Sequence, residues 1–137
     1  MHVLQVSPYF PPTWSYGGIP RIVDGLSRSL VSKGVRVSVV TTDAFDQQSR
    51  ASVDKVRDHH GVSVYTLPNL SNSIAYRHQL FVPMLWNTVR HHFLDVDVIH
   101  LHGHRHLLNN LATRFAAQEN IPYVLTANGT LRRHERK

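Results

Sequence analysis

Short apolar runs alternate along this chain with longer segments in which apolar residues recur every three or four positions. Runs of the first kind are typical of buried strands, and segments of the second kind predict amphipathic helices. The expected strands cover 3–7, 35–42, 62–67, 96–101 and 123–126. The expected helices cover 20–33, 76–93 and 107–118. Because strands and helices alternate, the pattern predicts an α/β fold with a parallel sheet and right-handed crossovers.

The predicted elements assemble into one Rossmann-like domain. We expect an open sheet of about five strands in the order 3-2-1-4-5, numbered along the chain, with helices on both faces. The polar segment 43–52 predicts a loop, and segment 53–60 predicts either a short helix or irregular structure. Pro83 is expected to break or start the helix over 76–93. No repeat or linker divides residues 1–137, so we expect a single domain.

The stretch from residue 3 to residue 33 is the most informative part of the sequence. An apolar run is followed by a loop rich in aromatic residues and prolines, which ends in Gly17-Gly18. A helix starts near Pro20, where the missing N–H costs nothing. Its expected apolar stripe is formed by Ile19, Ile22, Val23, Leu26, Leu30 and Val31. A strand, a glycine turn and a helix in this order open many nucleotide-binding domains, because glycines let backbone amides and the positive helix end approach an anion.

The segment 76–93 carries apolar and basic residues together. Its expected apolar side is formed by Phe81, Met84, Leu85, Val89 and Phe93. Trp86 and several arginines and histidines lie beside this stripe, as in helices on anionic membrane surfaces. Such a stripe is more often that of a helix packed on a sheet, and we favour this interpretation.

Composition and charge exclude several classes of protein. The chain has no cysteine, so neither a disulfide framework nor a thiolate metal site can form. No apolar run approaches the roughly 20 residues that span a bilayer. No basic leader precedes an apolar block, so we expect no signal peptide. Half of the net charge of +6 comes from residues 131–137, and the rest is scattered, so we do not expect a nucleic-acid partner.

Ligands of open parallel sheets bind beyond the carboxyl ends of the strands, which nominates residues by position. The candidate site residues are Gly17, Gly18, Arg21, His102, His104, Asn128, Gly129 and Thr130. Gly17-Gly18 is either an anion-approaching turn or a plain turn before a helix. Arg21 opposes the helix dipole, which suggests an anionic ligand, although an exposed arginine fits equally well.

Several polar residues allow two interpretations. His100 and His102 share one face of a strand, as do metal ligands of the His-x-His type, but no carboxylate or cysteine lies nearby in sequence, so we expect no metal site. His102 or His104 holding a hydroxylated ligand is the better hypothesis. Asp43 closes the second strand, where an acid would hold the ribose of a nicotinamide cofactor, but an ordinary loop aspartate fits at least as well.

The whole set of motifs resembles the N-terminal domain of a family 4 retaining glycosyltransferase of the GT-B fold. The matching stretches are HVLQVSPYFPP, YGGIPRIVDGLSRSLVSKGVRVSVVTTD, DVDVIHLHG and IPYVLTANGTL, in the order of that family. The resemblance implies that Gly17 and Gly18 approach the donor diphosphate and the acceptor. Many relatives have an active-site histidine before the glycine of the last motif, and here that position is Asn128, which cannot titrate near neutral pH. His102 and Asn128 are therefore only candidates for a catalytic role.

The resemblance also implies partners. A nucleotide-sugar would be the co-substrate, no cofactor would be needed, and the acceptor would be a glycan or a lipid-linked sugar. A C-terminal domain with paired glutamates would bind most of the donor, so we expect no activity from these 137 residues alone. The expected location is cytoplasmic, with peripheral contact at the inner face of the membrane as a further option. The alternative is a stand-alone nucleotide- or anion-binding module or a non-catalytic partner subunit.

Overall fold

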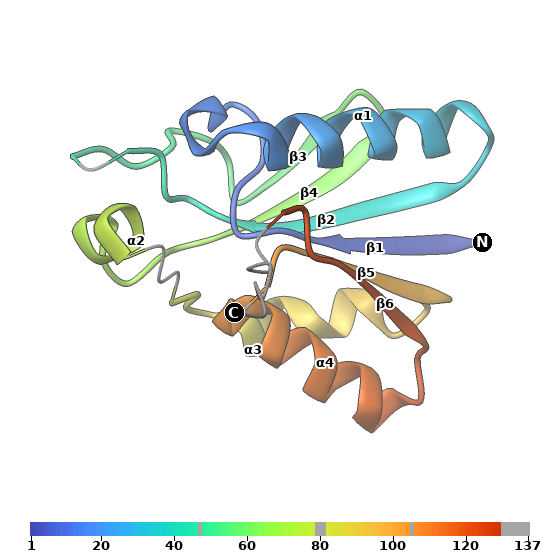
Figure 1. Ribbon diagram of the computed structural model, residues 1–137. Coiled ribbons are helices and arrows are strands. Elements are labelled where there is room, and N and C mark those ends of the chain that lie inside the picture. Colours follow the sequence, from blue (N-terminus) through green and yellow to red (C-terminus); the bar gives the residue numbers. More distant parts are fainter. Residues whose placement is uncertain (47, 79–81, 105, 130–137) are drawn as a thin grey trace, which may run out of the picture.

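A computed structural model describes residues 1–46, 48–78, 82–104 and 106–129, which form one sheet with helices on both faces (Figure 1). The strands are β1 (His2–Val6), β2 (Arg36–Thr42), β3 (Val56–His59), β4 (Val62–Leu67), β5 (Val98–His102) and β6 (Tyr123–Thr126). The helices are α1 (Gly18–Ser32), α2 (Asn72–His78), α3 (Trp86–Val89) and α4 (Leu107–Glu119), with the 3-10 turns η1 (Trp14–Tyr16) and η2 (Arg90–Phe93). Thr130, the basic segment 131–137 and Phe81 lie outside the described residues.

The sheet confirms the predicted topology and adds one strand to it. Its order is β3-β4-β2-β1-β5-β6. Five of these strands run parallel, in the order that the sequence predicts. β3 is antiparallel to β4, so the expectation of a helix or irregular structure at 53–60 was wrong. Because β3 is an edge strand without a buried residue, it lacks the apolar alternation by which strands are recognised.

A two-residue turn at His60-Gly61 joins β3 to β4. Both residues have positive φ, 55° and 80°, as a type I′ hairpin requires. A Cβ at residue 61 would also lie 3.0 Å from a methyl group of Val31. The His-Gly pair is therefore the sequence signal for the missed hairpin.

The helix expected over 76–93, with a break or a start at Pro83, is much more interrupted than predicted. Among its described residues, the segment holds the end of α2, an isolated β-bridge between Pro83 and Asn69, and then α3 and η2. Proline disfavours a helical conformation at the preceding residue, which explains the break. Trp86 and Phe93 are buried, as expected for packing on the sheet, but Met84 and Leu85 are exposed.

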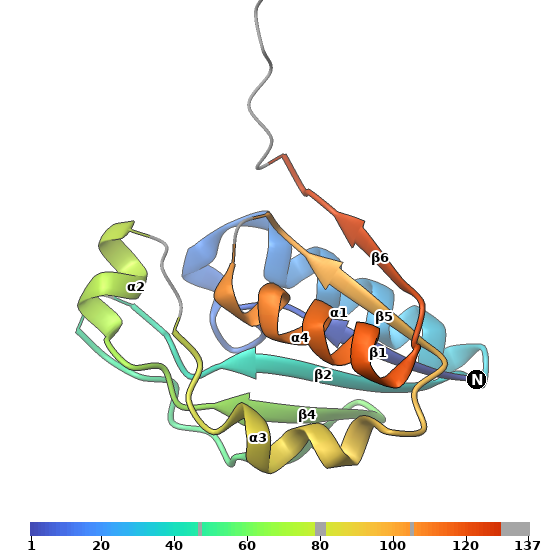
Figure 2. The same cartoon turned by 90° about the horizontal axis from the view of Figure 1, so that it is seen from below.

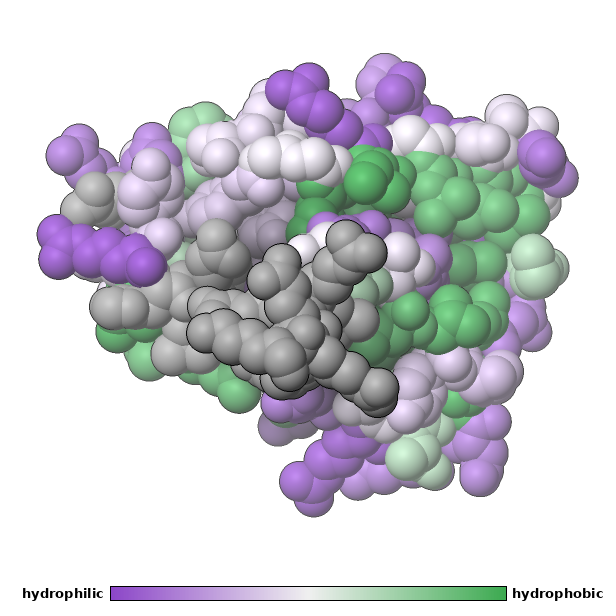
Figure 3. Space-filling view, viewed as in Figure 1, coloured by the Kyte–Doolittle hydropathy of each residue, from purple (hydrophilic) through white to green (hydrophobic). Residues whose placement is uncertain are grey.

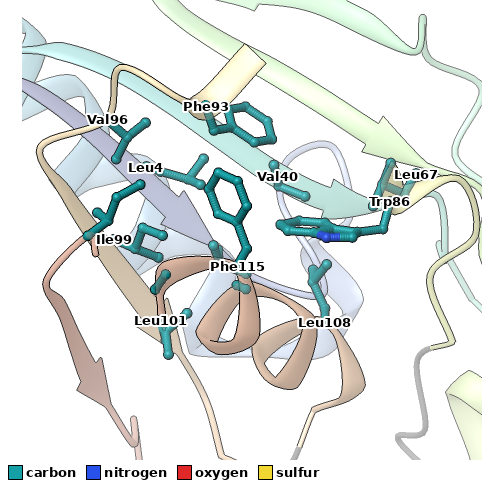
Figure 4. Packing of buried hydrophobic residues seen from close by; sticks show 14 residues of the cluster. Leu4, Val40, Leu67, Trp86, Phe93, Val96, Ile99, Leu101, Leu108 and Phe115 are labelled. Carbon is teal, nitrogen blue, oxygen red and sulfur yellow. The ribbon is translucent and has the colours of Figure 1, made fainter. Parts of the chain in front are cut away.

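Two layers of helices enclose the sheet. α1 lies on one face, and α3 and α4 lie on the other, as the two views show (Figures 1 and 2). The core under α3 and α4 is centred on the rings of Trp86, Phe93 and Phe115 (Figure 4). Each such ring stabilises the fold by about 1.5–3 kcal/mol when it is fully buried.

The α1 face is only partly covered. Ile19 and Val23 are buried as predicted, but Ile22 is 50% exposed, so its assignment to the apolar stripe was wrong. β6 forms the other edge of the sheet, and Tyr123, Val124 and Leu125 are each about half exposed. Apolar surface consequently gathers between α1 and β6 on the face in view (Figure 3). α1 therefore covers one part of its sheet face and leaves the side toward β6 open.

Candidate functional site

The turn between β1 and α1 lies at the carboxyl edge of the sheet. Gly17 has φ 83° and ψ −137°, a conformation that favours glycine strongly, and it precedes the first residue of α1. Gly17 and Gly18 are both exposed. A Cβ on Gly18 would meet no atom within 4 Å, so the backbone at the start of α1 is open to an approaching group. The positive end of the helix dipole points at the same place.

Aromatic side chains surround this turn. A pocket of about 460 Å³ is lined by Ser15, Tyr16, Gly17 and Tyr76. Tyr16 stacks on the buried Tyr9 with a ring separation of 4.9 Å, and Tyr76 meets it edge-on at 6.2 Å. Burial, followed by the neighbouring Tyr76 and Asp46, raises the pKa of Tyr16 to about 12, so its hydroxyl is neutral at physiological pH. The pocket therefore joins apolar rings, a hydroxyl and exposed backbone.

Arg21 lies one turn into α1, and its side chain lies over an aromatic ring. Its guanidinium carbon is 5.5 Å from the centre of the Trp14 ring, which is a cation–π distance. Both residues are exposed. The structure thus places this cation beside the glycine turn. Because the side chain is exposed, an anionic ligand can reach it.

The loop after β5 depends on a second glycine. Gly103 has φ 77°, and a Cβ there would lie 2.6 Å from Nε2 of His106. His106 is buried, and its ring meets Tyr9 edge-on at 6.2 Å. Burial, with a smaller contribution from His104, lowers the pKa of His106 to about 4, so this ring is neutral at pH 7. Through Tyr9, His106 links the loop after β5 to the glycine turn after β1.

His102 ends β5 and is completely buried. Its Nε2 lies 2.6 Å from Oε1 of Gln5, and the Nδ2 of Asn128 lies 3.3 Å from its Nδ1. Burial, and then the adjacent His100, lowers the pKa of His102 to about 3, so the imidazole is neutral at physiological pH. The amide of Asn109 donates to the carbonyls of His102 and Gly103 and holds the loop in place.

The turn after β6 is formed by two residues with positive φ, Asn128 at 51° and Gly129 at 79°. Asparagine and glycine are the residues that adopt this conformation at the smallest cost. Asn128 is half-buried and turns its side chain to His102, whereas Gly129 is exposed. The structure therefore brings two predicted site residues, His102 and Asn128, into direct contact.

The remaining candidates are placed elsewhere. His104 lines a separate pocket of about 310 Å³ between α4, β5 and β6, not the pocket at Gly17. Asp43 accepts the Asn69 N–H at 2.7 Å and pairs with the Arg50 guanidinium, so its carboxylate supports local structure, as the simpler interpretation holds.

The histidine pair is occupied by hydrogen bonds within the sheet. His100 bonds Thr126 through Nε2 at 2.8 Å, and both ring nitrogens of His102 have partners. In the part of the chain that the structure describes, no three His, Asp or Glu side chains gather as a metal site would require. Nor does any helix of that part have the length and apolar character needed to cross a bilayer.

Three residues of this site were missed from the sequence. Gln5 lay in an apolar run, and His106 and Tyr76 were not among the candidate site residues. A polar residue inside an otherwise apolar buried strand, such as Gln5, was the available signal, because buried polar groups need partners. Nothing in the local sequence indicated that Tyr76 would reach the pocket at Gly17.

A mostly parallel sheet with helices on both faces and a glycine turn at its carboxyl edge defines a Rossmann-like α/β domain. A family model described as Glycosyltransferase Family 4 matches residues 16–137. The chain therefore belongs to glycosyltransferase family 4, and its fold is that of an N-terminal GT-B domain. The match begins at Tyr16, directly before the glycine pair, and includes all but one of the strands. No curated protein matches the chain.

Proposed function

We propose that this chain is the acceptor-side domain of a retaining glycosyltransferase. The enzyme would transfer a sugar from a nucleotide-sugar to a glycan or a lipid-linked acceptor. Family membership supports a glycosyltransferase function in general. The observation that carries the finer proposal is the exposed turn Gly17-Gly18 at the start of α1, on the carboxyl edge of the sheet.

In this proposal the turn binds the charged part of the donor. A diphosphate needs several N–H donors at close range, and the absence of side chains at Gly17 and Gly18 allows that approach. Arg21 supplies a positive charge one turn into α1. Asn128 offers a hydrogen bond to a sugar hydroxyl, and the exposed Gly129 completes the proposed edge of the site among the described residues. Thr130 stays a candidate on its sequence position alone.

A second domain belongs to this proposal. Paired glutamates on a C-terminal GT-B domain would bind most of the donor, so residues 1–137 alone should not turn over a nucleotide-sugar. Determining the reading frame beyond Lys137 tests this directly. We expect a second α/β domain with paired glutamates, and a stop codon there would contradict the enzyme proposal.

The role of the turn can be tested with a matched pair of glycine variants in the longer gene product. Gly18 and Gly25 are both exposed residues of α1, and a Cβ at either would meet no atom within 4 Å, so alanine fits at both positions. We expect Gly18→Ala to lower kcat/KM for the donor about tenfold, equivalent to about 1.4 kcal/mol. Gly25→Ala lies two turns away and should leave kcat/KM unchanged. Equal behaviour of the two variants would contradict the proposed contact.

We also propose peripheral membrane contact at the inner, cytoplasmic face for the α2–α3 surface. This surface is defined by the exposed residues Leu70, Ile74, Met84 and Leu85. Arg77 and Arg90 lie on the same segments and carry the charge that attracts anionic lipids. A lipid-linked acceptor would be delivered to such a surface.

A further inference from the structure

A row of three polar side chains crosses the sheet from its interior to its carboxyl edge. Gln5 on β1 and His102 on β5 are both fully buried, and Asn128 follows β6 at the surface end of the row. Neighbouring members are joined by the contacts of 2.6 Å and 3.3 Å described above. The strands β1, β5 and β6 are adjacent in the sheet, so each side chain of the row lies directly beside the next.

The protonation of the middle member decides the orientation of the outer one. A neutral imidazole has one N–H donor and one acceptor nitrogen. With Nε2–H donating to Oε1 of Gln5, Nδ1 is the acceptor, and Asn128 must present its NH2 group to it. The carbonyl oxygen Oδ1 of Asn128 is then the atom of this amide that does not face Nδ1, and the contact with His102 is the side-chain hydrogen bond that Asn128 makes among the described residues.

Gln5 contains a buried polar group that should lower the stability of the fold. Its Nε2 is buried and has no hydrogen-bond partner among the described residues. Buried polar groups are nearly always paired, and an unpaired one in a native structure calls for a reason other than stability. Its carbonyl oxygen serves only His102, which suggests that the reason lies at the other end of the row.

We propose that His102 is a positioning residue that fixes the amide of Asn128 with Oδ1 facing outward, so that this point accepts a hydrogen bond from a ligand hydroxyl. The inference rests on the proposed function for the identity of that hydroxyl as one of a sugar. His102 itself cannot touch a ligand, because it is fully buried and both ring nitrogens are engaged. Asn128 makes the contact, and Gln5 and His102 set its direction.

The proposal predicts the position of one proton, which can be measured without any ligand. The 137-residue chain is labelled with 15N-histidine, its rings are assigned through bonds to the backbone, and long-range 1H–15N correlations are recorded at pH 7. We expect the proton of His102 on Nε2. A proton on Nδ1 would overturn the proposal, because Asn128 would then turn its Oδ1 inward and its NH2 outward.

Variants at both ends of the row sharpen the result. Asn128→Asp has no N–H to give, so its carboxylate should draw the His102 proton from Nε2 to Nδ1. Asn128→Gly tolerates the positive φ and leaves Gln5 in place, so the proton should remain on Nε2. Retention of Nε2–H in the Asp variant would overturn the proposed coupling between these side chains.

The consequence for catalysis is tested in the longer gene product. Gln5→Met keeps the size of the side chain, removes the acceptor for Nε2–H and also removes the unpaired Nε2. We expect a fold about as stable as the parent, because one unpaired buried group, Nε2 of Gln5, is exchanged for another, Nε2 of His102. We expect kcat/KM to fall about tenfold through misdirection of Asn128. Unchanged kcat/KM would overturn the positioning role. If the unmodified longer gene product had no transferase activity, the proposed function would be contradicted. The position of the His102 proton would still test the proposed arrangement of Gln5, His102 and Asn128.

Discussion

The two sides of the carboxyl edge are built on different principles. After β1, the chain exposes backbone at Gly17 and Gly18 and surrounds it with aromatic rings. After β5 and β6, it buries His102 and Gln5 in a hydrogen-bonded row of side chains, leaves Asn128 half-buried and exposes Gly129. The first side offers N–H donors and positive potential, which suit a phosphate. The second offers a directed side-chain amide, which suits a hydroxyl.

The difference shows where each side is vulnerable. The glycine turn depends on backbone conformation, so a substitution acts there through φ and through access to the ligand. The second side depends on the protonation of buried histidines and on the close packing of their rings, so pH acts there, and so does a methyl group added at Gly103. His106 and Tyr9 join the two sides through an edge-on ring contact of 6.2 Å.

The largest expected effect is that of Gly103→Ala. The new methyl group must adopt a positive φ and displace the buried His106 ring, which lies 2.6 Å from its ideal position. Together, backbone strain and overpacking should lower the free energy of unfolding by about 2–4 kcal/mol. Urea denaturation measures this, with Gly18→Ala as the control that meets neither problem. Equal stability of the two variants would show that the second side is not tightly packed.

Mild acid should destabilise the fold through the second side. The pKa values of His102 and His106 are lowered to about 3 and about 4 in the native state, whereas an unfolded histidine has a pKa of 6.5. The unfolded chain therefore binds more protons below pH 6.5, and stability falls as pH decreases toward the native pKa values. Between pH 7.5 and 5.5 each ring should contribute a loss of about 1.4 kcal/mol. Equilibrium unfolding at the two pH values tests this, and a flat profile would contradict it.

Alanine substitutions at Gly17 and Gly18 should differ in their effect on stability. Gly17→Ala must adopt φ near 83° and should cost about 1–2 kcal/mol of stability. Gly18→Ala sits at the start of a helix with open space around its methyl group and should change stability by less than about 0.5 kcal/mol. Thermal unfolding of both variants provides the measurement. If Gly18→Ala were the more damaging change, the turn would be packed in solution in a way that the structure does not show.

The smallest expected effect is on membrane binding by the α2–α3 surface, which lies near the glycine turn and not near the polar row. We expect weak co-sedimentation with vesicles containing anionic lipid, reduced about twofold to fivefold by Ile74→Ser. Val56→Ser, at an exposed apolar position on β3, is the matched control. Binding that is equal in both variants, or equal with neutral vesicles, would contradict a specific lipid-facing surface.

Strong local signals explain which parts of the fold were predictable. β1, β2, β4 and β5 are largely buried runs rich in apolar residues, and their order is the one expected of a Rossmann-like domain in which strands and helices alternate. β3 has no buried face and could be found only through its His-Gly turn. The break at Pro83 was anticipated, but the αL conformation of Leu85 that starts α3 has no signature in its neighbours.

The sequence alone determined the positions of the parallel strands, the glycine turn before α1 and the residues that follow each strand, because periodicity and glycine act over a few residues. The strand order then followed from the fold class that this alternation predicts. Only the tertiary structure decided that Gln5, His102 and Asn128 form one row and that Asp43 is used by Asn69 and Arg50. Apart from the Asp43–Arg50 pair, these contacts join residues that lie far apart along the chain. Their distances depend on the register of neighbouring strands and on burial, which no local pattern encodes.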